Sequence, residues 1–494
     1  MPDISGIDHP EVAKAKPAAS TLPTSFFAQH YIVDVDSLGK PDTPPTYKRF
    51  ASSGLGSMLN GSTADATGSG HGRIVMPHPV GPLVTRRDAR AADVTITVKT
   101  ASFVITLVCT PPYGEPASSS SSSSSGSPTC DKAANSLKRA AMRLERSLYL
   151  PTPITVSTTF RSFCGSTDQA YLGRACPTDD TTLGYAAPAG WHVFTRQAAA
   201  TFGLDPAFSY PSSLAKQYVP NDPVIAAIAV DVSAAFNSDV NWWFASDADD
   251  VGRPDSGAWA RFQTVMGGFY GSGGASYDFE QIAMHEICHG LGFISSWFTW
   301  IDDSTFLPSF LDRDSAGNVL GLAPAYIYSR WMSDAINTVW LKTYADVISA
   351  SVVDALAVGG QSGWLSVFQA STGGRVARAL GGSDGLFQTP RAIVSWYPDV
   401  ERNPVATSAA ASSSRPYNAS ITFKFAVIYT PQTYAAGSTL SHLDSAFYAR
   451  TSDLVMRPSG TSGAGVDAML TSNPKGCLGE AMLGVFRSMG YVTL

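Results

Sequence analysis

The stretch DFEQIAMHEICHGLGF, residues 278–293, decides how the rest of the chain is interpreted. It predicts a helix, because Asp278 suits the N-cap position and Gln281, three residues later, completes a capping box. The glycines at the end of the stretch predict where the helix stops. The side chains expected to face the core are Ile282, Ile287 and Leu291.

Within this helix, residues 285–289 form an HExxH motif. Residues four apart lie on one face of a helix, so His285 and His289 can reach one zinc ion at about 2.0–2.1 Å. Glu286 is then placed to take a proton from water at the metal, as a general base does. The alternative is two packing histidines that fall four apart by chance, which is rare in a chain with eight histidines.

A catalytic zinc usually takes a third protein ligand. The compact pattern HExxHxxGxxH would place it at position 295, which is Ser295, although Gly292 matches the glycine of that pattern. Of the other histidines, four lie in the low-complexity N-terminal region, and His192 in GWHVF is explained by strand packing. His442 is therefore the candidate third ligand. The alternatives are an ordinary loop role for His442 and an acidic ligand from Asp302 or Asp303.

The order HEICHGLGF, a long insertion, SHLD and then DLVMRP resembles the leishmanolysin family of metzincin zinc proteases. The segments FNSDVNWWF and AMLGVFRSMGY are also similar to secreted proteases of this type. The resemblance covers residues 225–300 and 435–494. It implies zinc on His285, His289 and His442, Glu286 as general base and Met456 in a Met-turn beneath the metal. The insertion before His442 carries no signature of the family.

Periodicity along the chain predicts alternating strands and helices. Strand patterns are expected at 94–108 (one strand or a hairpin), 154–160, 223–236 and 421–430. Helices are expected at 135–150, 346–360 with a glycine stop, and 477–491. This order predicts an α/β (α+β) zincin-like catalytic domain. Its N-terminal α/β subdomain would carry the HExxH helix, and its C-terminal mixed subdomain the Met-turn and the last helix.

Four segments are expected along the chain. The first, rich in Pro, Gly, Ser and Ala, would be mostly disordered or a pro-segment. The HExxH subdomain follows, then an insertion of mixed structure, and then the third-ligand loop with the Met-turn and terminal helix. Their boundaries are 1–90, 91–297, 298–436 and 437–494.

Composition limits the possible partners. A formal net charge of −6 gives no electrostatic footprint for nucleic acid, and no apolar run is long enough for a membrane span. The protease interpretation implies peptide or protein substrates, and we expect a monomer. Low charge and six cysteines suggest a secreted protein, whereas the N-terminus lacks a signal-peptide pattern. The alternatives are a non-catalytic secreted or surface protein that keeps a zinc site, and a cytosolic protein with a vestigial protease domain.

The cysteines suggest disulfide bonds on an ordinary core. We expect local pairs between Cys109 and Cys130 and between Cys164 and Cys176. Cys288 would lie near Cys477, because the last helix could support the zinc helix from behind. Aspartates at 247, 249 and 250 suggest either a calcium loop or a solvated turn.

Overall fold

The computed structural model describes the chain in segments. The residues described are 27–33, 47–50, 93–111, 127–163, 182–240, 242–244, 277–302, 305–381, 391–398, 423–431, 434–435, 437–449, 451–460 and 478–494. The expected disulfide partners Cys164, Cys176 and Cys477 lie outside these ranges, as do the acidic residues at 247–250.

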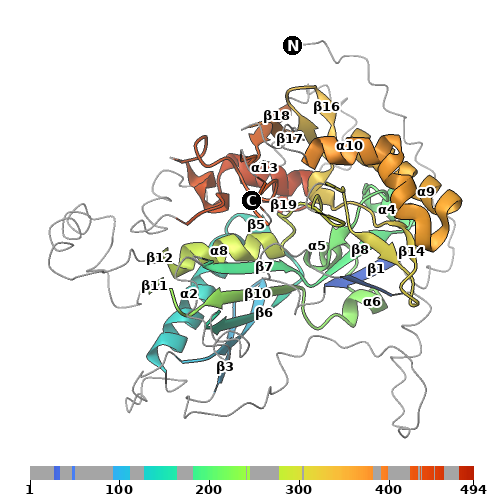
Figure 1. Cartoon of the computed structure of the whole chain (residues 1–494). Coiled ribbons are helices and arrows are strands. Elements are labelled where there is room, and N and C mark those ends of the chain that lie inside the picture. Colours follow the sequence, from blue (N-terminus) through green and yellow to red (C-terminus); the bar gives the residue numbers. More distant parts are fainter. Residues whose placement is uncertain are drawn as a thin grey trace, which may run out of the picture.

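A mixed sheet forms the base of the molecule (Figure 1). Its strands, in spatial order, are β3 (Val94–Lys99), β4 (Phe103–Cys109), β6 (Ile154–Arg161), β10 (Val232–Asn237) and β7 (Gly184–Pro188). β4, β6 and β10 run parallel, while β3 and β7 pair antiparallel at the two edges. Residues 94–108, predicted as one strand or a hairpin, form the hairpin of β3 and β4, and the strand predicted at 154–160 is confirmed.

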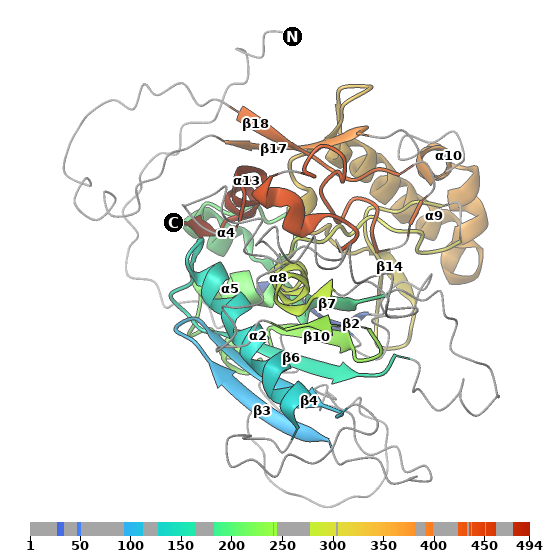
Figure 2. The ribbon, with the colours of Figure 1, turned by 90° about the vertical axis from the view of Figure 1, so that its left-hand side faces the viewer.

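Helices α2 (Pro128–Glu145) and α8 (Phe279–Gly290) lie side by side over this sheet (Figure 2). The expected pair Cys109–Cys130 is a disulfide, with Cα atoms 5.8 Å apart, and it ties the end of β4 to the start of α2. Between the two helices, Arg139 Nε lies 2.7 Å from the buried Glu280 carboxylate. The helix predicted at 135–150 is confirmed, but it begins earlier and ends at Glu145.

The strand predicted over 223–236 is wrong in its first half. Residues Pro223–Ala226 form the short helix α6, and β10 begins only at Val232. The local cause is Asp222, whose side chain accepts a hydrogen bond from Val224 N, with proline at the first helical position. This capping chemistry overrides the apolar, strand-like composition of the segment.

A second sheet contains residues of the N-terminal segment. β1 (Phe27–Val33) pairs antiparallel with β2 (Tyr47–Phe50) and with β8 (Gly190–Phe194), which in turn pairs with β9 (Tyr210–Pro211). The rest of residues 1–90 lies outside the described ranges. Two short helices follow β8 in sequence, α4 (Arg196–Phe202) and α5 (Ser212–Tyr218).

The region between the HExxH helix and His442 has mixed structure. Its third sheet has the order β16 (Val339–Trp340), β15 (Met332–Asp334), β17 (Ile393–Pro398) and β18 (Phe423–Val427). The remaining elements are β13 (Leu311–Arg313), β14 (Val319–Leu322), η3 (Ile327–Ser329), α9 (Leu341–Ala370) and α10 (Thr372–Gly381). The expected glycine stop is a break inside α9, where Gly360 has φ 57° and ψ −169°.

The last part of the chain returns to the HExxH subdomain. After η6 (Ser452–Met456) and α13 (Glu480–Met489), β19 (Val492–Thr493) pairs with β5 (Leu148–Tyr149) directly after α2. The predicted C-terminal helix is confirmed, although it begins only at Glu480, and the apolar residues expected in it are buried: Leu478, Met482, Val485 and Met489. The short strands β11 (Trp242–Trp243) and β12 (Tyr277–Asp278) pair in parallel, and β12 directly precedes α8.

The fold is therefore of the mixed α+β class, as expected at the coarse level. Within the described ranges, no helix combines the length and apolar character that crossing a bilayer requires.

Candidate metal centre

Helix α8 begins where the sequence predicts. Asp278 Oδ1 accepts hydrogen bonds from Glu280 N at 2.8 Å and from Gln281 N at 3.3 Å, which confirms the expected N-cap. The side chains expected in the core are all buried: Ile282, Ile287 and Leu291. Strands β7 and β10 and helix α2 pack against α8, so both the sheet and the neighbouring helix hold it in position.

The two glycines at the end of α8 have different roles. A Cβ atom on Gly290 would lie 2.1 Å from Val232 Cγ1, so glycine allows the helix to approach β10 closely. Gly292 has φ +101°, a backbone conformation that favours glycine, and it turns the chain away from the helix. This turn brings Phe293 O to within 2.7 Å of His289 Nδ1.

Three histidines converge at one face of α8. His289 Nε2 lies 3.0 Å from His285 Nε2 and 3.2 Å from His442 Nε2. His442 Nε2 lies 3.2 Å from His285 Nε2, which closes a nearly equilateral triangle. The structure thus brings together the two residues of the helix and the candidate third ligand, 153 residues after His289.

The other nitrogen of each ring contacts a backbone carbonyl. His285 Nδ1 lies 2.6 Å from Val455 O, His289 Nδ1 lies 2.7 Å from Phe293 O, and His442 Nδ1 lies 3.0 Å from Ser438 O. A carbonyl only accepts, so each Nδ1 carries the proton and donates. The three Nε2 atoms of the neutral rings are then acceptors that face one another.

Burial keeps these rings neutral. It lowers the pKa of His285 to about 4 and that of His442 to about 3. The pKa of His289 lies well below its usual range, chiefly because of burial and secondly because of the neighbouring His285 and His442. Neutral imidazole is the form that binds a metal ion.

This arrangement fits a zinc ion. Three lone pairs directed at one point, without a donor hydrogen between them, repel one another unless a cation binds all three. Tetrahedral ligand atoms about 2.0–2.1 Å from zinc lie roughly 3.3–3.4 Å apart, close to the sides of this triangle. Each ring is also oriented by a carbonyl behind it, as is usual for metal-binding histidines.

The chain matches one family model over residues 113–259 and 273–493, which is more than half of its length. It belongs to the SPBPB7E8-like family. The matched ranges include the three histidines and Glu286. No curated protein and no solved structure matches the chain.

Glu286 of this SPBPB7E8-like protein is buried between α8 and the edge strand β7. Among the described residues, its Oε2 atom has no hydrogen-bond partner. Burial raises the pKa of the Glu286 carboxyl to about 8. Gly184 on β7 makes room for it, since a Cβ there would lie 3.3 Å from Glu286 Cγ and 2.9 Å from Ala235 O.

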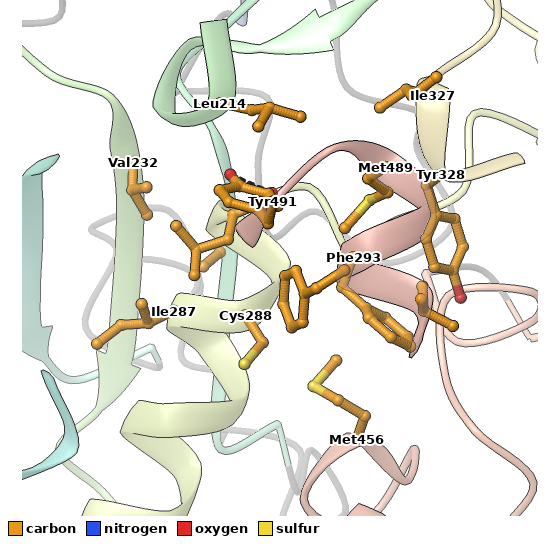
Figure 3. Packing of buried hydrophobic residues seen from close by; sticks show 14 of the residues in the cluster. Leu214, Val232, Ile287, Cys288, Phe293, Ile327, Tyr328, Met456, Met489 and Tyr491 are labelled. Atoms are coloured by element: carbon orange, nitrogen blue, oxygen red, sulfur yellow. Dashed lines mark hydrogen bonds between the residues drawn. The ribbon is translucent and has the colours of Figure 1, made fainter. Parts of the chain in front are cut away.

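Met456 ends the short helix η6, which lies against α8. Its side chain is fully buried, in the same apolar cluster as Cys288, Phe293 and Met489 (Figure 3). Val455, the preceding residue, provides the carbonyl that orients His285. The Met456 segment of this family member is therefore in contact with the histidine site.

Two other candidates from the sequence, His192 and Asp302, have hydrogen-bond partners outside the triangle. His192 is buried in β8, where Nε2 lies 2.8 Å from Ser212 Oγ, as strand packing predicts. Asp302 Oδ2 accepts a hydrogen bond from Thr305 Oγ1, and Asp303 is outside the described residues. In the described part of the chain, the group that could hold a metal ion consists of His285, His289 and His442.

The carbonyls behind the rings could not be identified from the sequence. Every residue has a backbone carbonyl, so Val455 O, Phe293 O and Ser438 O leave no mark in the pattern of side chains. A partial signal existed for Gly184, because glycine often marks a close approach of the backbone. Glu286, for which it makes room, lies far away along the chain.

Proposed function

We propose that this chain is a zinc-dependent metalloendopeptidase of the metzincin type, with a zincin-like catalytic fold. One observation carries the proposal. Three neutral imidazole Nε2 atoms meet within 3.0–3.2 Å of one another, and the glutamate of the same HExxH motif has an unpartnered, buried carboxylate oxygen. A purely structural zinc site does not need that glutamate.

His285, His289 and His442 would hold the zinc ion, and three protein ligands leave a position open for chemistry. When bound there, zinc supplies a Lewis acid that polarises a peptide carbonyl and acidifies a water molecule. The protein contributes ring orientation through the three carbonyls, and these fix which nitrogen of each ring faces the metal.

Glu286 would move the proton. Its carboxylate accepts a proton from the attacking water and then donates it to the nitrogen of the leaving amine. In the metal-free site, burial raises the pKa of Glu286 to about 8, so the carboxyl is mainly protonated at neutral pH. The ionised form is favoured once a cation is held by the three imidazoles nearby, because opposite charges attract.

The resemblance to leishmanolysin supports the same assignment. His442 is followed by the buried Met456, in the order that metzincins use, and the Met456 segment contacts the histidine site through Val455 O. The Cys109–Cys130 disulfide supports an oxidising compartment, since such bonds persist in secreted proteins. Peptides or proteins would be the substrates.

The test compares the parent chain with Glu286→Ala, measuring bound zinc and the cleavage of casein. We expect both proteins to bind zinc, and the variant to lose roughly 10²-fold or more in turnover, as for loss of a general base. Equal cleavage by the two proteins would exclude the proposed role of Glu286. Zinc bound by a parent chain that cleaves nothing would support the non-catalytic alternative, and a metal-free parent would exclude the zinc site.

A further inference from the structure

The short helix η6 holds two parts of the histidine site at once. Val455 O accepts the hydrogen bond from His285 Nδ1 at 2.6 Å. The next carbonyl, Met456 O, accepts a hydrogen bond from Leu443 N at 2.8 Å, directly after His442. A displacement of η6 would therefore alter both the ring orientation of His285 and the position of His442.

Asp453 fixes η6 to the C-terminal helix α13. Its Oδ1 accepts a hydrogen bond from Met482 N at 2.8 Å, and its Oδ2 lies 3.4 Å from Ala481 N. The N-cap residue of α13, Gly479, has no side chain that could accept these hydrogen bonds. Asp453 accepts them instead, although it lies 28 residues before Ala481 in the chain. A Cβ on Gly479 would lie 2.2 Å from Asp453 Cγ, so the contact requires glycine there.

The other end of α13 reaches the end of the HExxH helix. After Gly490, which ends α13 with φ +118°, the buried Tyr491 donates its hydroxyl hydrogen to Leu291 O at 2.8 Å. Ser213 Oγ lies 3.0 Å from the same hydroxyl and 3.4 Å from Gly290 O. These bonds satisfy carbonyls at the C-terminus of α8, next to the turn whose Phe293 O contacts His289.

We infer that α13 is a brace that sets the geometry of the metal site, with Asp453 and Tyr491 as its two positioning residues. Neither residue belongs to the metal-binding group of the described chain, and each acts on a histidine through the backbone. At one end the brace holds the segment that orients His285 and His442, and at the other end it holds the turn behind His289. This inference rests on the proposed zinc binding by the three histidines.

The test measures the zinc affinity of the full chain by competition with a chelator. Asp453→Ala and Tyr491→Phe should each weaken zinc binding by about 10–100-fold, the usual cost of losing an outer-shell partner. Asp453→Asn keeps an oxygen for Met482 N and should stay close to the parent. Gly479→Ala leaves Asp453 in the sequence but pushes it away, and should weaken binding as Asp453→Ala does.

Two matched controls separate positioning from general destabilisation. Asp222→Ala removes a buried aspartate that caps α6, and Tyr210→Phe removes a buried hydroxyl that bonds the backbone of Asp205. Neither cap nor hydroxyl is bonded to the histidine site, so both controls should keep the zinc affinity of the parent. The visible spectrum of bound Co²⁺ should change in Asp453→Ala and stay constant in Asp222→Ala.

The outcomes distinguish the inference from the proposed function. If the parent binds no zinc, the proposed function fails, and the brace fails with it. If the parent binds zinc and Asp453→Ala and Tyr491→Phe bind it equally well, only the brace is refuted. A loss of affinity in the controls that matches the loss in the variants would also refute it, because stability alone would then explain the effect. If Asp453→Ala does not fold, the zinc affinities of Gly479→Ala and Tyr491→Phe test the brace instead.

Discussion

Helix α8 and the segment around His442 each supply imidazole to the same triangle, but by different means. On α8, the regular helix places His285 and His289 one turn apart, and a local N-cap and the strand β10 hold the helix. The segment of His442 has no regular helix or strand. It is held by Tyr429 N, which donates to His442 O at 2.8 Å, and by the bond from Leu443 N to Met456 O. Local helix geometry therefore determines the positions of two histidines, whereas contacts with distant parts of the chain determine the position of the third.

Removal of the third histidine should have the largest effect on the metal. We expect His442→Ala to weaken zinc binding by more than the 10–100-fold typical for an outer-shell partner, because a ligand itself is lost. His192→Ala, which removes another buried histidine, should keep the affinity of the parent. Metal analysis after dialysis measures both, and equal zinc retention in the two variants would remove His442 from the site.

Acid should destabilise the metal-free protein, because burial in the folded state lowers the pKa of His442. The pKa of His442 is about 3 in the folded protein and about 6.5 in an unfolded chain, so below pH 6.5 the unfolded chain binds more protons. The stability that this histidine contributes is fully present above pH 6.5 and is lost as the pH falls towards 3. Between pH 7 and pH 5 the loss should be about 2 kcal/mol.

Denaturant unfolding of the chelated protein at the two pH values measures this loss. In His442→Ala the difference between pH 7 and pH 5 should shrink by that amount. An unchanged difference would mean that His442 is not held neutral by burial.

The fit of α8 against the sheet can be tested at Gly290. A methyl group there would meet Val232 at 2.1 Å, so Gly290→Ala should destabilise the fold by about 1–3 kcal/mol, as overpacking does. Gly363→Ala in α9 is the control, because no atom lies within 4 Å of the added methyl group. It should be neutral or stabilise by up to about 1 kcal/mol. Equal effects in thermal unfolding would show that α8 does not depend on this close approach.

The smallest effect on the metal is expected from the N-terminus. A chain that begins at Ala91 loses β1, which pairs with β8, and β2, which pairs with β1. It retains all three histidines and their carbonyl partners. We expect lower stability, since the edge of β8 is uncovered, and unchanged zinc affinity. Folded but metal-free protein from the shortened chain would show that the N-terminal segment takes part in building the site.

Much of the fold could be predicted because it depends on local patterns. The alternation at 94–108 predicted β structure, which the structure resolves as the β3–β4 hairpin, and Asp278 marked the start of α8. The error at 223–226 arose where a capping aspartate and a proline favour a helix turn within an apolar run. Apolar composition alone does not distinguish a short strand from a short helix. The signal for a helix at this point is the capping residue Asp222, followed by a proline.

The sequence by itself determined the pair His285 and His289 and the adjacent Glu286, because a helix places residues four apart on one face whatever surrounds it. It also named His442, but only by elimination and resemblance. The tertiary structure alone decided that His442 Nε2 lies 3.2 Å from both other rings, which nitrogen of each ring faces inward, and that Asp453 joins η6 to α13. These features depend on backbone carbonyls, which every residue has, and on contacts between residues far apart in the chain. Neither produces a pattern of side chains that can be recognised in the sequence.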